Sequence, residues 1–429
     1  MKIILFPEKQ SWQTECQRPE IDKTDLNAVV REILDSVKLE GDNAICRLSE
    51  RFDSLFLTDL KVSSKEFIES SGQVPEELKK AINIAKNNIE KFHRVQLHDE
   101  SIIETTKGVK CWRKNVAIEK VGLYIPGGSA PLFSTVLMLG IPAKLAGCNK
   151  IIICTPAGKD GKISPVILYT AQLIGITEIF KVGGAQAIAA MAYGTESIPK
   201  VNKIFGPGNQ YVTRAKELVQ QDGIAIDMPA GPSEVLVIAD KNANSQFVAA
   251  DLLSQAEHGP DSQVIMLTDN QELIAIVKAE VEKQVKQLTR EKIARKALEN
   301  SKLILLSSLE QCIEFSNIYA PEHLIINTSS PMALAERVKN AGSVFLGSFS
   351  CESAGDYATG TNHTLPTNGF AMSYSGVSIE SFIKKISFQE VSGEGIRNLG
   401  PLIEIMAEAE SLNGHKNAVS VRLKSLKNG

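Results

Sequence analysis

The sequence has no stretch suited to crossing a membrane or to export. No segment approaches about 18 uninterrupted apolar residues, which is the length that a membrane-spanning helix needs. The N-terminal run Met1–Glu8 has too few apolar side chains for the core of a signal peptide. An excess of one charge is also missing, since the formal net charge is -3 at pH 7 and no block of lysine or arginine stands out. We therefore expect a cytoplasmic protein with neither a membrane nor a nucleic acid as its partner.

The cysteines provide no disulfide framework and no thiolate metal site. The seven residues are odd in number, scattered along the chain, and include no Cys-x-x-Cys pair. Most are expected to be small buried hydrophobic residues, whereas Cys351 lies in a polar loop. A nucleophilic role for Cys351 is not favoured, because the sequence fixes no base beside it. A serine hydrolase is not favoured either, because the Gly-x-Ser-x-Gly motif is absent.

What the sequence does contain is the composition of a large globular protein with an α/β pattern. At 429 residues, 43% of them hydrophobic, the chain is long enough for two or more domains with sizeable cores. The first ~120 residues show mostly helical patterns, and from Val121 apolar strand-like runs alternate with helical ones. Such alternation predicts parallel sheets with crossover helices.

The expected strands fall into two series. The first series is Val121–Ile125, Ile151–Cys154, Ile179–Val182 and Val201–Phe205. The second series is Val235–Ala239, Gln263–Leu267, Leu303–Leu306, Leu324–Asn327 and Ser343–Leu346. We therefore predict an α/β fold with two Rossmann-like parallel-sheet units of similar plan, a helical N-terminal segment and an appended C-terminal tail domain. After Tyr374-Ser375-Gly376 the strand–helix rhythm stops, so the tail is free to reach away from its own body.

One helix carries a row of side chains that can bind a metal. The helix is expected to open near Asn244 or Ser245 and to end at Gly259-Pro260, with Asp251, Gln255 and His258 at i, i+4 and i+7 along one ridge. His258 would then stand at the helix C-terminus and face open space. The row is only half of a metal site, because zinc takes about four ligands.

Three glycine loops follow strands of the first series. They are Pro126-Gly127-Gly128-Ser129-Ala130-Pro131, Gly183-Gly184-Ala185-Gln186 and Gly206-Pro207-Gly208-Asn209. Each lies at the carboxyl end of a parallel strand and opens a helix, where main-chain N–H groups favour a phosphate. None matches Gly-x-Gly-x-x-Gly, so a nucleotide site and plain tight turns both remain open.

The acid–base candidates lie in the second series. Glu322 and His323 stand side by side at the start of a buried strand, either as a pair addressing one substrate or as structural residues. Asp356 and His363 occupy a polar loop containing glycine, either as functional groups or as part of a solvated loop.

Several long motifs together resemble the histidinol dehydrogenase family nearly from end to end. They are the segments 121–128, 183–187, 206–209, 227–234, 251–261, 321–324 and 353–357. The sequence departs from the family's pattern at Cys351, where the pattern has proline. The resemblance implies NAD-dependent oxidation of L-histidinol through L-histidinaldehyde to L-histidine, the last steps of histidine biosynthesis. It also implies one Zn²⁺ per subunit and a homodimer with shared active sites.

The resemblance assigns roles to individual residues. It implies the zinc ligands Gln255, His258, Asp356 and His415. For the substrate it implies Ser233, Gln255, His258, His323, Asp356, His363, Glu410 and His415, and for NAD it implies Tyr124, Gln186 and Asn209. His323 is expected to be the general base and Glu322 to activate water.

The expected domains follow from these assignments. Residues 1–20 form an N-terminal extension, and residues 21–123 with 235–377 form a first α/β domain that carries the metal and acid–base residues. Residues 124–234 form a second α/β domain with the NAD loops. Residues 378–429 form the tail domain, which contributes to the partner subunit's site.

Two interpretations from other classes stay open at this stage. A zinc hydrolase could use the same ligands, with Glu322 activating water and no nucleotide at the glycine loops. The second interpretation is a catalytically silent α/β scaffold, although such a scaffold would not need the metal-capable row or Glu322-His323.

Overall fold

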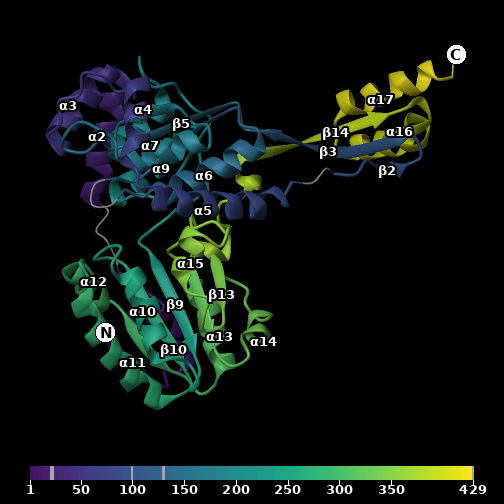
Figure 1. Cartoon of the computed structure of the whole chain (residues 1–429). Coiled ribbons are helices and arrows are strands. Elements are labelled where there is room, and N and C mark those ends of the chain that lie inside the picture. The colour runs from purple at the N-terminus through teal and green to yellow at the C-terminus, as the bar shows by residue number, and fades with distance from the viewer. Residues whose placement is uncertain (20–23, 98–99, 128–130, 428–429) are drawn as a thin grey trace.

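The computed structural model describes residues 1–19, 24–97, 100–127 and 131–427. The chain forms two α/β domains, one above the other in Figure 1, and a long arm that carries the C-terminal helices to one side. Each domain is built on one parallel sheet, and the described part of the arm contains an antiparallel sheet. The predicted α/β class with two parallel-sheet units is confirmed.

The first domain is built on the five-stranded sheet. Its strands are β4 (Lys120–Tyr124), β5 (Lys150–Thr155), β6 (Glu178–Lys181), β7 (Lys203–Phe205) and β8 (Ala225–Ile226), in the order β6-β5-β4-β7-β8. The connecting helices are α6 (Phe133–Ala146), α7 (Pro165–Leu173), α8 (Gly184–Tyr193) and α9 (Gln210–Gln221). All pairs are parallel, as the strand–helix alternation predicts.

The second domain is built on the six-stranded sheet, which is also parallel. Its order is β1 (Lys2–Leu5), β11 (Lys302–Leu305), β10 (Gln263–Thr268), β9 (Glu234–Ala239), β12 (His323–Asn327) and β13 (Ser343–Leu346). Its helices are α10 (Ser245–Ala256), α11 (Gln271–Gln284), α12 (Glu291–Glu299), α13 (Leu309–Tyr319), α14 (Pro331–Ala335) and α15 (Glu352–Tyr357). Short 3₁₀ turns are η1 (Lys9–Ser11), η2 (Val285–Gln287), η3 (Phe370–Met372) and η4 (Ile379–Phe382). Every strand of the predicted second series is confirmed.

The N-terminal segment differs from the predicted extension. Its strand β1 pairs with β11 from Lys2↔Lys302 to Leu5↔Leu305, so it is the edge strand of the six-stranded sheet. The following helix α1 (Trp12–Glu15) buries Trp12 edge-on against Phe315, with ring centroids 5.6 Å apart. The segment is part of the second domain because its apolar side chains complete that domain's core.

The N-terminal helices also pack differently from the prediction, which grouped residues 21–123 with 235–377. The helices are α2 (Thr24–Glu40), α3 (Asp42–Asp53), α4 (Ser64–Gln73) and α5 (Glu76–Arg94). Val30 and Leu34 share a core with Ile188 of α8, and Ile82 and Ile89 share one with residues of α6 and α7. These helices therefore cover the five-stranded sheet. Helical periodicity shows that a helix has an apolar face, but not which sheet that face covers.

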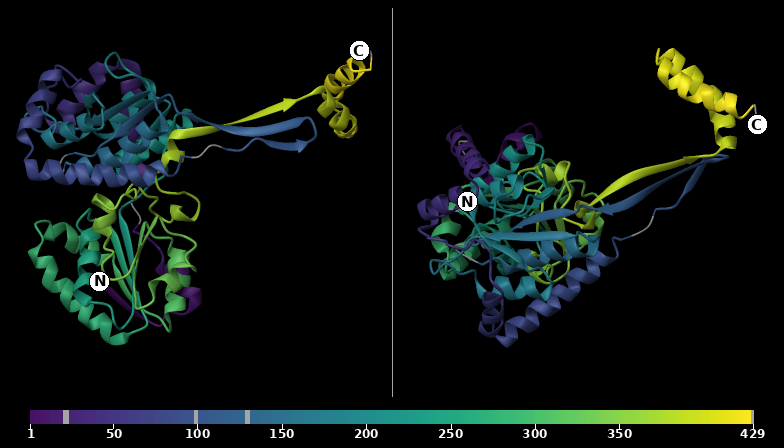
Figure 2. Two further views of the ribbon diagram at one scale, coloured as in Figure 1. Left: turned by 45° about the vertical axis from the view of Figure 1, so that its right-hand side comes forward. Right: turned by 90° about the horizontal axis from the view of Figure 1, so that it is seen from above.

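The arm joins two segments that are distant in the sequence. Strand β14 (Ile383–Val391) pairs antiparallel with β3 (Val109–Ala117), which in turn pairs with β2 (Ile103–Thr106). Trp112 and Phe388 stack across the ladder with ring centroids 5.5 Å apart. Helices α16 (Gly393–Ala409) and α17 (Asn413–Ser425) stand at the far end, away from both domains (Figure 2). The tail reaches outward as predicted, but residues 103–117 belong to it rather than to an α/β domain.

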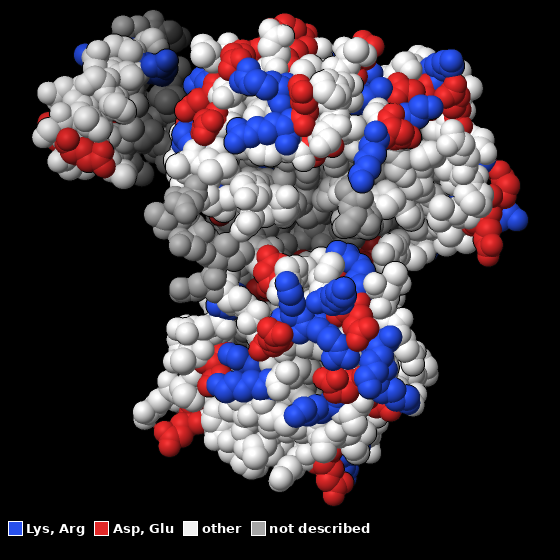
Figure 3. Space-filling model, turned by 90° about the vertical axis from the view of Figure 1, so that its left-hand side faces the viewer, with Lys and Arg blue, Asp and Glu red and all other residues white. Residues whose placement is uncertain are grey.

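The surface shows no strong segregation of charge on the face drawn in Figure 3, where lysine and arginine are interspersed with aspartate and glutamate on both domains. Among the described residues, no helix is both long enough and apolar enough to cross a bilayer.

Gly206 is a position where the fold requires glycine. Its φ is +128°, and a Cβ there would lie 2.1 Å from the main-chain oxygen of Tyr124. Gly223 also has a positive φ, +92°, but nothing lies within 4 Å of its Cβ position.

We expect Gly223→Ala to lower the free energy of unfolding by about 1–2 kcal/mol through backbone strain alone. Gly206→Ala adds a main-chain clash and is expected to cost clearly more.

Urea unfolding of both variants measures this difference. Equal stability of the two variants would contradict the close approach of Gly206 to Tyr124.

Candidate active site

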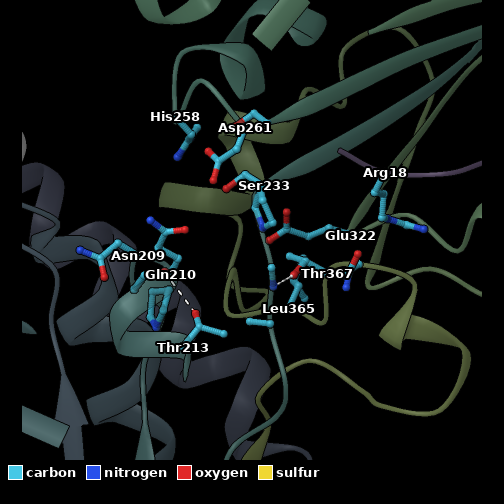
Figure 4. A pocket seen from close by; sticks show the side chains of 18 of the residues that line it. Arg18, Asn209, Gln210, Thr213, Ser233, His258, Asp261, Glu322, Leu365 and Thr367 are labelled. Carbon is cyan, nitrogen blue, oxygen red and sulfur yellow. Dashed lines mark hydrogen bonds between the residues drawn. The ribbon is translucent and has the colours of Figure 1, made fainter. Parts of the chain in front are cut away.

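A cleft with a volume of about 1730 Å³ lies between the two domains. Its walls are the loop after β7 (206–209), the segment before β9 (230–233), the turn after α10 (258–262) and the loop 363–369. The Thr367 hydroxyl accepts a hydrogen bond from the Gly231 N–H, which ties two of these walls together (Figure 4). The first domain therefore contributes carboxyl ends of its strands, and the second domain contributes amino ends of β9, β10 and β12.

The helix α10 positions the metal-capable row as the sequence predicts. Asn244 caps its N-terminus by accepting from the Gln246 N–H, and the helix ends just before His258, which is exposed. Gln255 is buried at the end of the helix. Asp251, the third member of the row, is buried, and burial raises the pKa of its carboxyl to about 7.

Two carboxylates of α15 meet His258. Glu352 and Asp356 are one helical turn apart, so both carboxylates lie on one face of this short helix. One potential ligand atom from each of His258, Glu352 and Asp356 lies within 4.8 Å of the others. The structure thus brings His258 and Asp356 together across about a hundred residues of sequence, and adds Glu352.

Gln255 is oriented by Glu352. Its Nε2 donates to Oε1 of Glu352, while the Ser254 hydroxyl donates to Oε2 of the same carboxylate at 2.5 Å. Because Nε2 donates to the carboxylate, Oε1 is the atom of the Gln255 amide that Glu352 does not contact. This oxygen is buried without a hydrogen-bond partner. A buried acceptor without a partner is costly, and a cation would satisfy it.

The electrostatics of this cluster also favour a cation. Burial raises the pKa of the Glu352 carboxyl, and Asp356 lies next to it. Burial would raise the pKa of Asp356 too, but the His323 imidazole beside it holds that pKa well below its usual range. The C-terminus of α10 adds the negative end of a helix dipole. Imidazole, carboxylate and amide oxygen donors suit a zinc-like ion, so the residues fit the metal implied by the resemblance.

The acid–base pair is held by the main chain of one residue, Glu234, at the start of β9. The Glu234 N–H donates to Oε2 of Glu322 at 2.8 Å, and the Glu234 carbonyl lies 3.1 Å from Nδ1 of His323. A carbonyl only accepts, so Nδ1 of His323 carries the proton in this contact. In the neutral imidazole, Nε2 is then the atom that accepts a proton, and it lies 3.4 Å from Oδ1 of Asp356.

The pKa of His323 reflects its carboxylate neighbours. Burial alone would lower it, but the negative charges of Glu322 and Asp356 outweigh burial and raise it well above its ordinary value. A bound cation would oppose these carboxylates and lower the pKa of His323, so more of the imidazole would be unprotonated and able to accept a proton than in the metal-free site.

His363 lies at the edge of the cleft and is held from two sides. Its Nδ1 donates to the Asp356 carbonyl at 3.0 Å, and its Nε2 lies 3.2 Å from the hydroxyl of Thr135 on α6. Burial lowers the pKa of His363, which favours the neutral imidazole that these two partners require. Ser233 also lines the cleft, next to Glu322 (Figure 4).

The residues predicted to contact NAD lie at the carboxyl ends of the five-stranded sheet. The buried hydroxyl of Tyr124 accepts from the Gly184 N–H at 3.1 Å, and Gln186 is buried in the first turn of α8. Asn209 is exposed in the cleft, where its side chain caps α9. Gly128, Ser129 and Ala130 of the first glycine loop lie outside the described residues.

Glu410 and His415 are not brought to the cleft within one chain. Glu410 ends α16 and His415 lies in the first turn of α17, both exposed on the arm (Figure 1).

Sequence reasoning missed three polar residues of the site. Glu352 stands four positions before Asp356, a spacing that would have placed it on the same helical face. Thr135 and Arg18 have no local signal, because their partners are far away in the sequence.

The fold and the cleft define an α/β enzyme in which a candidate metal site adjoins an acid–base pair. The family model of histidinol dehydrogenase matches residues 16–423. Histidinol dehydrogenase of Bacteroides thetaiotaomicron is 58% identical over the full length of both chains, and that of Yersinia pestis is 52% identical over 96% of this chain and 93% of its own. The crystal structure of histidinol dehydrogenase from Elizabethkingia anophelis superposes with a TM-score of 0.97 at 58% identity, covering 100% of this chain and 99% of that one.

The chain belongs to the histidinol dehydrogenase family, whose members are NAD-dependent oxidoreductases of histidine biosynthesis. The predicted family and the predicted class of enzyme are confirmed.

Proposed function

We propose that this chain oxidises L-histidinol through L-histidinaldehyde to L-histidine, reducing two NAD molecules with one Zn²⁺ per subunit. The observation that carries the proposal is the contact between the metal-capable cluster and a buried imidazole base beside the cleft that His258 and Glu322 line. His323 Nε2 lies 3.4 Å from Asp356, which in turn clusters with His258. A cytoplasmic location accords with this biosynthetic role.

Zinc would be held by Gln255, His258 and Asp356 of one chain and by His415 of the partner subunit. Bound there, it supplies a fixed positive charge that orients the imidazole and amine nitrogens of the substrate. The unpartnered Oε1 of Gln255 supports this role, since it is already directed away from Glu352.

A homodimer would bring the tail of one chain to the cleft of another. The arm leaves large apolar side chains exposed, with Leu402 at 56%, Ile405 at 66% and Met406 at 64% of full exposure. Neighbouring apolar side chains exposed to this extent favour burial against another surface. Glu410 of the partner subunit would then offer a carboxylate to the substrate amine.

For the first oxidation, His323 Nε2 accepts the proton of the substrate hydroxyl. The Glu234 carbonyl holds Nδ1–H and so keeps Nε2 as the accepting atom. Tyr124, Gln186 and Asn209 would hold NAD, which would supply the acceptor for the hydride. Ser233 and His363 line the cleft and hold the substrate in place.

For the second oxidation, the aldehyde must first add water because it has no hydroxyl to deprotonate. Glu322 activates this water. One of its carboxylate oxygens accepts a hydrogen bond from the Glu234 N–H, and Glu322 lines the cleft. His323 accepts the proton of the resulting hydrate. Each acid–base contribution is typically worth about 10²–10⁴-fold in rate.

The first prediction from this proposed function tests the reaction and its metal. We expect two NADH per L-histidinol consumed, measured by absorbance with product analysis by chromatography. Chelation followed by removal of the chelator should abolish NADH formation, and added Zn²⁺ should restore it. Hydrolysis without NADH formation would instead support a zinc hydrolase.

The second prediction separates the two acid–base residues. His323→Asn should depress both oxidation steps by roughly 10²-fold or more, whereas Glu322→Gln should slow mainly the oxidation of the aldehyde. Steady-state rates with L-histidinol and with L-histidinaldehyde as substrates measure the two steps. Equal losses with both substrates in both variants would contradict the division of roles.

The third prediction concerns the shared site. Mixed dimers of inactive His415→Asn and His323→Asn subunits should recover part of the activity, because one of their two clefts would contain both native residues. Dimers that combine two His323→Asn subunits are the matched control and should stay inactive. No recovery in heterodimers verified by mass spectrometry would argue against a ligand supplied by the partner.

A further inference from the structure

Arg18 connects the N-terminal segment to the cleft. Its side chain is only 16% exposed, and its guanidinium forms a fork on the carboxylate of Glu234, with Nε at 2.5 Å and Nη2 at 2.9 Å from the two oxygens. Nη2 also donates to the Tyr319 carbonyl at 2.7 Å, and the guanidinium lies 4.0 Å from the centroid of the Tyr319 ring. Planar pairing and ring stacking of this kind suit arginine and not lysine.

Glu234 is the residue whose main chain holds both acid–base groups. Its N–H binds Glu322 and its carbonyl binds His323, so a movement of the Glu234 main chain moves both contacts. Its side chain is buried and accepts, besides Arg18, the main-chain N–H of Asn368 from the cleft loop 363–369. Figure 4 shows Arg18 to the right of Glu322, on the side away from His258.

A buried carboxylate needs a fixed cationic partner. Without the guanidinium, Glu234 would have to take up a proton or turn toward water, and either change alters the start of β9. Burial raises the pKa of the Glu234 carboxyl and Arg18 opposes that rise, which agrees with the geometry. Arg18 itself lines the cleft but is not one of the residues given a role in either oxidation step.

We propose that Arg18 is a positioning residue, which fixes the main chain at Glu234 and through it the orientation of Glu322 and His323. The role rests on the proposed function, because it matters only if these two residues perform the acid–base steps. The N-terminal segment then serves catalysis as well as completing the sheet.

The test uses Arg18→Lys, which keeps the charge but loses the fork. We expect kcat to fall at least tenfold with L-histidinol and with L-histidinaldehyde, with the KM for NAD and the bound zinc within twofold of wild type. Lys302→Met is the matched control, because Lys302 anchors the same segment by pairing with Glu15 without lining the cleft. It should keep kcat within twofold.

A double-mutant cycle distinguishes positioning from loss of stability. In single-turnover oxidation of L-histidinol, Arg18→Lys should add less than a threefold loss in the His323→Asn background, because the base that it positions is already absent. If Arg18→Lys fails to fold, the double variant Arg18→Gln/Glu234→Gln replaces it in the same measurements, because it removes both buried charges together.

Three outcomes would overturn the positioning role. They are wild-type kcat in folded Arg18→Lys, an equal loss in Lys302→Met, and a full tenfold further loss in the His323→Asn background. Wild-type protein that makes no NADH from L-histidinol would overturn the proposed function itself, and the role of Arg18 with it. Active wild-type protein with a fully active Arg18 variant overturns only the positioning role.

Discussion

The pairing of β12 with β9 is the constraint on which the rest of the site depends. The register His323↔Val235 places Glu234 beside Glu322 and His323 at the amino ends of two neighbouring strands. A shift of this register by one residue would turn every side chain of β12 to the opposite face of the sheet. The buried runs of both strands, which have no exposed residue, make such a shift costly. Packing of the sheet core therefore determines the tautomer and direction of His323.

The arrangement of buried charges around this strand pair is the second feature that shapes the site. Arg18, Glu234, Glu322, His323, Asp356 and Glu352 form a continuous chain of contacts from the N-terminal segment to α15. At the Arg18 end a guanidinium compensates the carboxylate. At the α15 end, the carboxylates of Glu352 and Asp356 form no ion pair with an arginine or lysine of the described residues, and the amide oxygen of Gln255 has no hydrogen-bond partner. The difference between the two ends locates the site for an added cation at α10 and α15.

The sequence was sufficient for local structure and insufficient for long-range packing. Each strand of the two predicted series exists, because β-branched runs and strand–helix alternation are local signals. The i, i+4, i+7 row on α10 was predicted from spacing alone, and the resemblance supplied Asp356. The helices 24–94 were assigned to the wrong sheet, and β1 and β3 were not recognised as partners of β11 and β14. Pairings of this kind join segments about 270–300 residues apart, and no residue pattern within either segment indicates which strand it pairs with.

The same limit explains which site residues were missed. Glu352 carries a helical spacing to Asp356 and was within reach of pattern reasoning. Arg18 was not, because its role comes from Glu234 and Tyr319, each more than 200 residues away. Identity of residue type was no guide either, since an arginine before a proline in an N-terminal segment is ordinary.

The arm gives the proposed metal site a dependence on assembly. One chain brings Gln255, His258 and Asp356 together around Glu352, and its arm carries His415 away from them. If a partner's His415 is the fourth ligand, each bound ion joins two chains, and zinc binding and dimer formation stabilise one another by mass action. The exposed apolar residues of α16 would supply association that does not depend on the metal. Metal-free protein would then remain dimeric while its clefts lack the ion, so metal content governs activity more than it governs assembly.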